Sequence, residues 1–466
     1  MRKDTKQKMC KSNKNGASEP LPLHLSHINK MAAGIDIGSK SHFVAVPEGC
    51  DEDCVREFSS FTADLHELAN WLEKCGIDTV AMESTGVYWI ALYEILEERG
   101  FEVKLVDARH VKNVSGRKTD VLDCQWLQQL HTYGLLNGAF RPNEQVCALR
   151  SYLRQRSMLI REGSSHIHHM QKALSQMNIQ LHNVLSDITG ETGMKIIRAI
   201  IGGERDAKKL SGYRDRNCKN PIEIIEKSLI GHYREEHIFA LTQAVELYDI
   251  YREKIIACDN KIEKQLLLFD EHTARESETK ETCETKKSKS RCKNKLSFDV
   301  KTHLIRITGI DLTAIPGIEA PSALKIISEI GLDLSRWKSS KHFASWLGLC
   351  PGNKVSGGKR LSGKSKRTAN YVASTLRMAA STLHRSQSAL GAFFRRLKFR
   401  LGAPKATTAA AHKLAVIIFN MLKTGSEYVE TGQGYYEKQH HERIVKSLRM
   451  RAEKLGFRLV ENVVNQ

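Results

Sequence analysis

The sequence predicts a mixed α/β domain, then a long helical arm, then a mainly helical C-terminal domain. Three observations support this fold class. Short β-like runs alternate with amphipathic helical segments between residues 31 and 108. Two longer segments then carry apolar residues at three- and four-residue spacing, and the apolar patterns that follow a polar stretch are helical as well. A chain of 466 residues has room for two to four domains, each with its own core.

The first domain is expected over residues 31–141, after a basic and disordered arm at residues 1–30. The segment 31–49 predicts a β-hairpin that turns at Gly38-Ser39-Lys40. Strands and helices then alternate, an order that suits a mixed sheet covered by helices, with ligands beyond the strand ends. The further strands are expected in CVREFSSF, DTVAMES and FEVKLVDA, and the helices in DLHELANWLEKCG and YWIALYEILEERG.

Residues 142–270 predict the helical arm. Apolar residues recur at helical spacing over 142–181 and again over 233–268, which favours an antiparallel coiled coil, with a plain helical bundle as the alternative. The first of these helices carries Arg150 and Arg154, so its outer face is basic. We expect this face to bind nucleic acid, although the arm could equally serve assembly.

A polar stretch over residues 271–296 has almost no large apolar side chain and is expected to be a linker or a surface insertion. The C-terminal domain follows over residues 297–440, with a tail over 441–466. Within it, ITGIDLTAIPGIEAPSALKIISEIG has the form of a helix, a Pro-Gly turn and a second helix. This predicts a helix-hairpin-helix that can direct backbone N–H groups at a phosphate. Two more helices are expected at about 368–384 and 404–423.

The composition indicates an ordinary soluble protein with a polyanionic partner. A net charge of +19, spread over several regions, favours nucleic acid as that partner. No apolar run approaches the roughly 18–20 residues of a membrane span, and the basic N-terminus lacks the apolar stretch of a secretory signal. The 11 cysteines include no CxxC pair, which favours reduced thiols. We therefore expect a cytoplasmic protein that does not enter membranes.

Four carboxylates are the candidate metal ligands. Asp36 lies on the first expected strand, Glu83 ends a later one, and Asp120 and Asp123 lie one helical turn apart in RKTDVLDCQWL. The helix that this pair opens would pack on the sheet and face the other two. Mg²⁺ prefers oxygen ligands, and two such ions can stabilise the attacking and leaving oxygens of a phosphodiester exchange. Each residue alone has a plainer explanation; Asp120 could be an N-cap, with Thr119 as its rival.

The motifs around these residues resemble a known family. GIDIGSKSH, MESTGVYW and GRKTDVLDCQWL resemble the RuvC-like, RNase-H-fold domain of the DEDD transposases of bacterial insertion sequences. These recombinases are described as guided by a bridge RNA and are related to the Piv-type invertases. The resemblance continues through IPGIEAPSALKIISEIG, FASWLGLCPGNKVSGGK and SKRTANYVASTLRMAA. It covers roughly residues 32–182 and 297–425, which include both chemically rich regions.

The resemblance implies a function and roles for individual residues. In that family the four acidic residues bind Mg²⁺, and a serine of an SG motif attacks DNA to form a covalent phosphoserine. By motif position these residues are Asp36, Glu83, Asp120, Asp123 and Ser356. The family further implies donor and target DNA, a structured noncoding guide RNA and a location in the bacterial cytoplasm. Its active sites are composite, with the carboxylates of one protomer beside the serine of another, so a homodimer or tetramer on nucleic acid is implied.

The residues around Ser356 suit a phosphodiester but do not by themselves identify a nucleophile. The glycines after it permit close backbone approach, and the neighbouring cations could stabilise a pentacovalent phosphate. Ser362 and Ser365 are rival nucleophiles, and a basic phosphate-binding loop without a nucleophile is the plainer interpretation. The loop residues expected to contact nucleic acid are Gly357, Gly358, Lys359, Arg360, Lys364, Lys366 and Arg367.

Several other patterns carry less weight. The run GKRLSGKS satisfies the P-loop pattern, but LGLCPGNKVSG before it is not a β-strand, so we reject an ATPase. SHIHHM and QHHER lack the helical spacing and glutamate of a zinc hydrolase. Asp107 is a spare carboxylate at a strand end. Two rival functions remain: a RuvC-like junction nuclease that uses metal-activated water, for which Ser356 is dispensable, and a non-catalytic architectural DNA binder.

Overall fold

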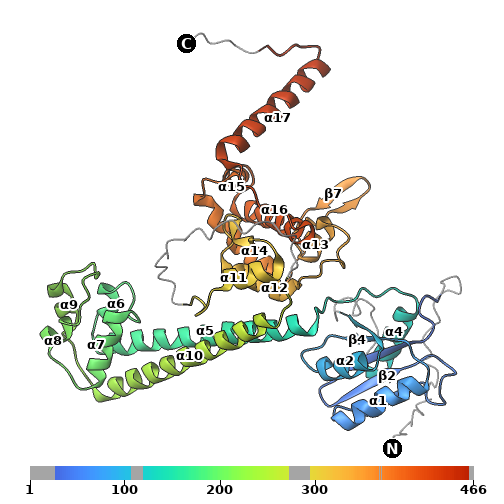
Figure 1. Cartoon of the computed structure of the whole chain (residues 1–466), viewed down its shortest axis with the longest axis horizontal. Helices are drawn as coiled ribbons and strands as arrows, with labels where there is room; N and C mark the ends of the chain where they lie inside the picture. Colours follow the sequence, from blue (N-terminus) through green and yellow to red (C-terminus); the bar gives the residue numbers. More distant parts are fainter. Residues whose placement is uncertain (1–26, 107–118, 272–293, 367, 369, 461–466) are drawn as a thin grey trace, which may run out of the picture. The chain divides into compact units, whose positions relative to one another are not determined.

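Figure 1 shows the chain as a computed structural model, which describes residues 27–106, 119–271, 294–366, 368 and 370–460. The chain divides into two compact units, Met1–Arg141 and Pro142–Gln466. Most of the expected basic arm and linker lie outside the described residues, as do Asp107 and Arg367. Within the described parts of the chain, no helix is long and apolar enough to cross a membrane.

The first unit is built on a five-stranded sheet in the order β3-β2-β1-β4-β5. The first three strands form an antiparallel meander that begins with the expected hairpin, and β4 and β5 extend the sheet in parallel beyond β1. All five lie in the segments where strands are predicted, so the mixed α/β sheet is confirmed. The strands are β1 Ala32–Ile37, β2 Ser41–Ala45, β3 Val55–Ser59, β4 Thr79–Glu83 and β5 Glu102–Val106.

Helices cover both faces of this sheet. α1 (Thr62–Lys74) and α2 (Trp89–Glu98) pack on one face, where their leucines share a buried core with alternate residues of β1, β2 and β4. α4 (Asp120–Thr132) packs against β1, β2 and β4. Because Ile35 and Ile37 point into the core under α1 and α2, the intervening positions of β1 face α4.

A buried histidine fastens the far end of α4 to the sheet. The Thr79 hydroxyl donates to the Glu102 carbonyl at 2.9 Å and has no second hydrogen, so it accepts from Nε2 of His131, also at 2.9 Å. The ring is therefore the neutral tautomer protonated on Nε2, and the Asn29 amide donates to the His131 carbonyl at 2.7 Å. Burial, and then the charge of Lys104, lower the pKa of His131 to about 4.

This histidine is expected to make stability fall with acidification. The unfolded chain protonates His131 below its ordinary pKa of 6.5, whereas the folded chain stays neutral until about pH 4, so folding loses free energy across that window. Between pH 7 and pH 5, wild type should lose roughly 2 kcal/mol more unfolding free energy than His131→Gln, whose amide can keep the Thr79 hydrogen bond. Urea denaturation of both proteins at the two pH values measures this. Parallel pH profiles would show that the histidine is not buried in its neutral form.

Two long helices of 33 residues each begin the second unit. α5 (Glu144–Gln176) and α10 (Glu235–Leu267) lie side by side over much of their length, as expected for the arm (Figure 1). Arg156 and Asp259 form a buried ion pair between them, and Arg156 also donates to the Asn294 carbonyl at 3.1 Å. The pairing of the helices agrees with the prediction, and coiled-coil packing stays a prediction. The short helices near the turn of the arm are α6 Leu181–Val184, α7 Glu191–Ile201, α8 Ala207–Ser211 and α9 Ile222–Ser228.

The rest of the second unit is mainly helical, as predicted. Of the expected helix–turn–helix, the second helix is present as α12 (Ala320–Ile330), but only the short 3-10 helix η1 (Leu312–Ala314) precedes the Pro-Gly turn. The helix before it, α11 (Val300–Thr308), ends at the left-handed Gly309, at the start of the predicted segment. The role of this segment as a DNA-binding helix-hairpin-helix stays a prediction. The remaining elements are α13 Ser340–Trp346, β6 Lys354–Ser356, β7 Lys359–Ser362, α14 Tyr371–Thr382, η2 Leu383–Arg385, α15 Ala389–Leu401, α16 Ala403–Thr424 and α17 Gly432–Lys454. The apolar patterns predict α14 and α16 but not α15 or α17, and the short strand β6 lies within LGLCPGNKVSG, where no strand is expected.

Candidate active site

Asp36 and Glu83 lie at matching positions of two neighbouring strands. In the parallel ladder of β1 and β4, Gly34 pairs with Ala81. Asp36 and Glu83 each follow two residues later, so both side chains point to the same face of the sheet as this pair. That face is the one under α4, because Ala81 packs against Leu127 of α4 in a small buried cluster. The strand register therefore directs both carboxylates toward the helix that carries the other two.

The start of α4 leaves its two aspartates available for a ligand. Thr119 is the N-cap, since its hydroxyl accepts from the backbone N–H of Leu122 at 3.4 Å. This decides between the two possible caps, because Asp120 is then the first residue of the helix and not its cap. Asp120 and Asp123 both lie in the first turn, where Asp120 is exposed and Asp123 is half-buried.

A glycine allows α4 to approach the sheet this closely. A Cβ on Gly34 would lie 2.3 Å from the backbone N of Gln128 and 2.4 Å from the carbonyl oxygen of Cys124. The missing side chain lets the helix backbone lie directly on β1, next to Asp36. Gly34 is not among the site residues predicted from the sequence, although a glycine inside a strand pattern is a known signal of close backbone approach.

We expect Gly34→Ala to destabilise the first unit and to reduce activity. The added methyl group meets helix backbone, which cannot rotate away, so α4 must shift off the sheet; the cost is about 1–3 kcal/mol or more. Gly434→Ala is the matched control, because a Cβ on Gly434 meets nothing within 4 Å and the residue lies in a helix. Thermal denaturation of both variants measures the effect. Equal melting temperatures would contradict the close approach.

The four carboxylates influence one another electrostatically. Burial raises the pKa of Asp36 to about 6, together with the negative charges of Glu83, then Asp120, then Asp123. The backbone N–H of Ile37 opposes this rise by donating to the carboxylate. The four predicted carboxylates thus lie on the α4 side of the sheet, near enough for the charges of the other three to act on Asp36, and we call this group the acidic site.

The donor set of this site fits a hard divalent cation. All four side chains offer oxygen, which Mg²⁺ prefers, and their repulsion at Asp36 is the kind that a bound cation relieves. Among the residues that the structure describes, no group of three or more His, Cys, Asp or Glu side chains is close enough together to hold a metal ion. Mg²⁺ usually takes only one or two protein carboxylates, together with waters and substrate phosphate.

Ser356 lies in the second unit, on an exposed β-hairpin. It ends β6 and pairs with Lys359 of β7, so Gly357 and Gly358 form a two-residue turn. Both glycines have positive φ, 54° and 73°, as a type I′ turn requires. A Cβ on either would meet nothing within 4 Å, so the glycines are needed for the backbone shape, and the hairpin tip is open to a large ligand.

The surroundings of the hairpin favour Ser356 over its two rivals. Ser356 is exposed, whereas Ser362 and Ser365 are half-buried. The Ser362 hydroxyl accepts from the backbone N–H of Lys364 at 3.3 Å, and Ser365 forms a β-bridge with Pro351 at the base of the hairpin. The side chains of Lys359, Lys364 and Lys366 are exposed, and Arg360 lies on β7.

The two arginines predicted to bind nucleic acid from the arm have partners within the second unit. Arg150 donates to the carbonyls of Ser328 and Glu329 at 3.1 and 2.8 Å. Arg154 donates to both carboxylate oxygens of Glu329 and stacks over the Tyr371 ring. Both therefore join α5 to α12, and a nucleic-acid role for them stays a prediction.

Comparisons with known proteins find two family matches, one over each candidate region. A model of DEDD transposases of the IS110 type matches residues 33–179, which include all four carboxylates. A second model, of the IS116/IS110/IS902 family of transposases, matches residues 311–395, which include Ser356. The comparison with curated proteins gave no match. These two matches support an insertion-sequence transposase, that is, a DNA-binding enzyme that cleaves and recombines DNA.

Proposed function

We propose that this transposase exchanges DNA strands through a covalent phosphoserine on Ser356, supported by Mg²⁺ at the four carboxylates. The observation that carries the proposal is the convergence of Asp36, Glu83, Asp120 and Asp123 on one face of the sheet. Oxygen ligands from two strands and one helix are what a metal-assisted phosphodiester exchange needs. When bound, Mg²⁺ would supply Lewis-acid stabilisation of the charge that develops on the phosphate oxygens.

The covalent bond to the serine conserves the free energy of the broken phosphodiester bond, so the strand can be rejoined without another energy source. Ser356 Oγ loses its proton and forms a bond to phosphorus, while one P–O bond of the DNA backbone breaks and the released DNA hydroxyl takes up a proton. A hydroxyl of the new partner strand then attacks the phosphoserine, and Ser356 is regenerated. The exposed lysines of the hairpin and its neighbourhood are suited to hold the DNA phosphates during both steps.

Several finer properties belong to the same proposal. The sheet, an antiparallel meander followed by parallel strands, supports a RuvC-like fold for the first unit. The net charge of +19 supports extended contact with nucleic acid, including a structured noncoding guide RNA beside donor and target DNA. The carboxylates and Ser356 lie in different units of the chain, an arrangement compatible with active sites shared between protomers of a dimer or tetramer.

Trapping under denaturing conditions tests the serine mechanism. Wild type is incubated with a labelled DNA substrate, any guide RNA that co-purifies with it and Mg²⁺, and then quenched with detergent. We expect a DNA–protein adduct that survives denaturation in wild type and is missing in Ser356→Ala.

The rival functions give different results in the same assay. A junction nuclease that activates water would cleave DNA without any adduct, and Ser356→Ala would cleave as well as wild type. An architectural binder would show neither cleavage nor adduct, and Asp36→Ala and Glu83→Ala would leave all of its activities unchanged. Either pattern would overturn the proposal.

A further inference from the structure

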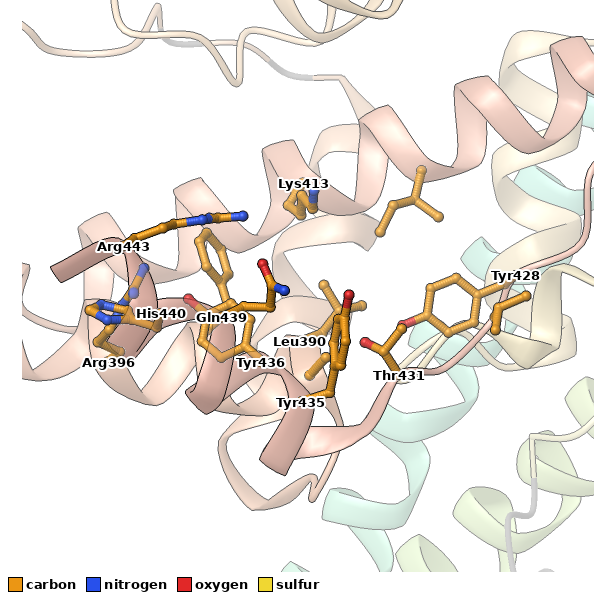
Figure 2. A pocket seen from close by; sticks show the side chains of 14 residues that line it. Leu390, Arg396, Lys413, Tyr428, Thr431, Tyr435, Tyr436, Gln439, His440 and Arg443 are labelled. Atoms are coloured by element: carbon orange, nitrogen blue, oxygen red, sulfur yellow. The ribbon is translucent and has the colours of Figure 1, made fainter. Parts of the chain in front are cut away.

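A pocket of about 480 Å³ lies between α15, α16 and the loop and first turns of α17 (Figure 2). Most of its lining follows residue 395, where the second family match ends. Its size falls within the range of about 300–1,000 Å³ that is usual for ligand sites. None of its lining residues belongs to the carboxylate site or to the Ser356 hairpin, so the proposed strand exchange does not account for this pocket.

Aromatic rings supply much of the lining. Phe393, Tyr428, Tyr435 and Tyr436 all contribute to it. Tyr435 is 55% exposed although it lies beside the pocket, so its ring face is available to a ligand. Tyr436 packs edge-on against Phe393, with ring centroids 6.3 Å apart, which fixes its orientation.

Cations surround these rings, and no carboxylate lines the pocket. Arg396, Lys413 and Arg443 contribute to the wall, and Figure 2 shows Arg396 and Arg443 together at one end. In the described parts of the chain, none of the three forms an ion pair with an acidic side chain. The sequences of α15 and α16 contain no Asp or Glu at all, although they carry seven Lys or Arg residues. The pocket therefore selects for negative charge.

Hydrogen bonds hold the pocket in shape. The carboxylate of Glu430 accepts from the backbone N–H groups of Ala389 and Gly432, each at 2.8 Å, and thereby ties the start of α15 to the start of α17. The Tyr428 hydroxyl donates to the same carboxylate at 2.8 Å. Arg395 donates to the side chain of Gln433 at 2.7 Å, which adds a second tie between these helices. The loop and the first turn of α17 are thus held against α15 before any ligand arrives, which lowers the entropic cost of binding.

A second pocket of about 390 Å³ adjoins the first. Arg396, Tyr436 and His440 line both, so they form a common wall. Arg396 lies over the Tyr436 ring, with its guanidinium carbon 5.3 Å from the ring centroid. Glu437 lines the second pocket, and its carboxylate accepts from the Gln433 amide at 2.6 Å. Two adjacent hollows with a shared cation suit a chain of repeating units better than one compact ligand.

We propose that this α15–α17 pocket binds single-stranded nucleic acid, with an unpaired base against Tyr435 and Tyr436 and its phosphates at Arg396 and Arg443. Stacking on aromatic rings beside a basic track is the general chemistry of single-strand recognition. A base within a duplex presents only its edge, so a stacking site requires an unpaired one. The strand can belong to DNA or RNA, because both offer the same base faces and phosphates.

Photocrosslinking of the full-length protein tests this site directly. The probes are 12-nucleotide thymidine DNA and uridine RNA, each with one central 5-iodouracil, and the corresponding duplexes. Irradiation should crosslink the single strands to Tyr435 or Tyr436. Mass spectrometry of the peptide around residues 433–443 identifies the crosslinked residue. The yield with the duplexes should be several-fold lower. Whichever of the two single strands gives the higher crosslink yield identifies the natural ligand as DNA or RNA.

Paired variants separate stacking and charge from effects on folding. Tyr435→Ala should weaken single-strand binding in fluorescence anisotropy by about tenfold, whereas Tyr435→Phe should keep wild-type affinity. Arg443→Gln should lower the crosslink yield several-fold. Lys446→Gln removes one charge from the same helix outside both pockets, and it should leave the yield within about twofold. Equal melting temperatures for all four variants would show that they are folded.

Several results would overturn the proposal. Crosslinks that map entirely outside α17, equal crosslinking of duplex and single strand, or unchanged affinity of Tyr435→Ala would each do so. Displacement of the oligonucleotides from α17 by polyglutamate at equal charge would show that charge alone is recognised. The inference goes beyond the proposed function and does not depend on it, because the assay needs no Mg²⁺ and gives the same expected result with Ser356→Ala.

Discussion

Ser356→Ala is expected to abolish strand exchange while DNA binding stays close to wild type. The substitution removes the nucleophilic oxygen, and no neighbouring hydroxyl is as open to a phosphate, since Ser362 and Ser365 are half-buried. Loss of a covalent nucleophile costs on the order of 10⁴-fold or more in rate. The hairpin itself should persist, because its turn depends on Gly357 and Gly358. Single-turnover strand-exchange kinetics and anisotropy with the same DNA measure the two properties.

The neighbouring serines supply matched controls for this variant. Ser362→Ala and Ser365→Ala make the same chemical change in the same hairpin region, and each should retain activity within about tenfold of wild type. A loss in Ser362→Ala as large as that in Ser356→Ala would point to a structural defect of the hairpin. Full activity of Ser356→Ala would remove the serine from the mechanism.

Asp36→Asn is expected to reduce strand cleavage by about 10³-fold or more and, without metal, to stabilise the protein. Asp36 is the half-buried carboxylate on which the charges of Glu83, Asp120 and Asp123 act, so an amide there relieves repulsion. The same substitution removes an anionic oxygen ligand, so charge stabilisation in the transition state is lost. In wild type, Mg²⁺ should raise the melting temperature because it binds the folded state. In Asp36→Asn this increase should be much smaller.

Glu67→Gln is the control for Asp36→Asn. It also neutralises one carboxylate of the first unit, but Glu67 is an exposed residue of α1, outside the acidic site. Its activity and its response to Mg²⁺ should equal those of wild type. If Mg²⁺ stabilised Asp36→Asn as strongly as wild type, the carboxylate site would not be the metal site.

The fold of the first unit is predicted well because its strands and helices are indicated by patterns within short stretches of sequence. Alternating apolar residues identify the strands, and the order of elements indicates a mixed sheet, which the structure confirms. The convergence of the carboxylates is harder to predict because it depends on strand register and on the docking of α4. Gly34 controls that docking, yet in the sequence it is one glycine among 31. The choice of Thr119 over Asp120 as the helix cap likewise needs coordinates.

The second unit shows where local patterns fail. α17 has no buried residue, and its apolar side chains are mixed irregularly with charged ones, so no helix is predicted there. The basic face of α5 has the composition of a nucleic-acid contact, but Arg150 and Arg154 meet Glu329, which lies more than 170 residues away. The aromatic and basic lining of the α15–α17 pocket likewise comes from three helices and a loop, so no single segment of the sequence predicts the pocket.

The most direct test of the serine mechanism is to identify the residue that carries DNA during the reaction. Quenched wild-type reactions are digested with nuclease and protease, and mass spectrometry locates the nucleotide-bearing side chain. We expect a nucleotide on Ser356 in wild type with Mg²⁺, and none in Asp36→Asn or when the metal is chelated. A nucleotide on another residue, or a Ser356 adduct that forms equally well in Asp36→Asn, would contradict the joint action of the carboxylates and the serine.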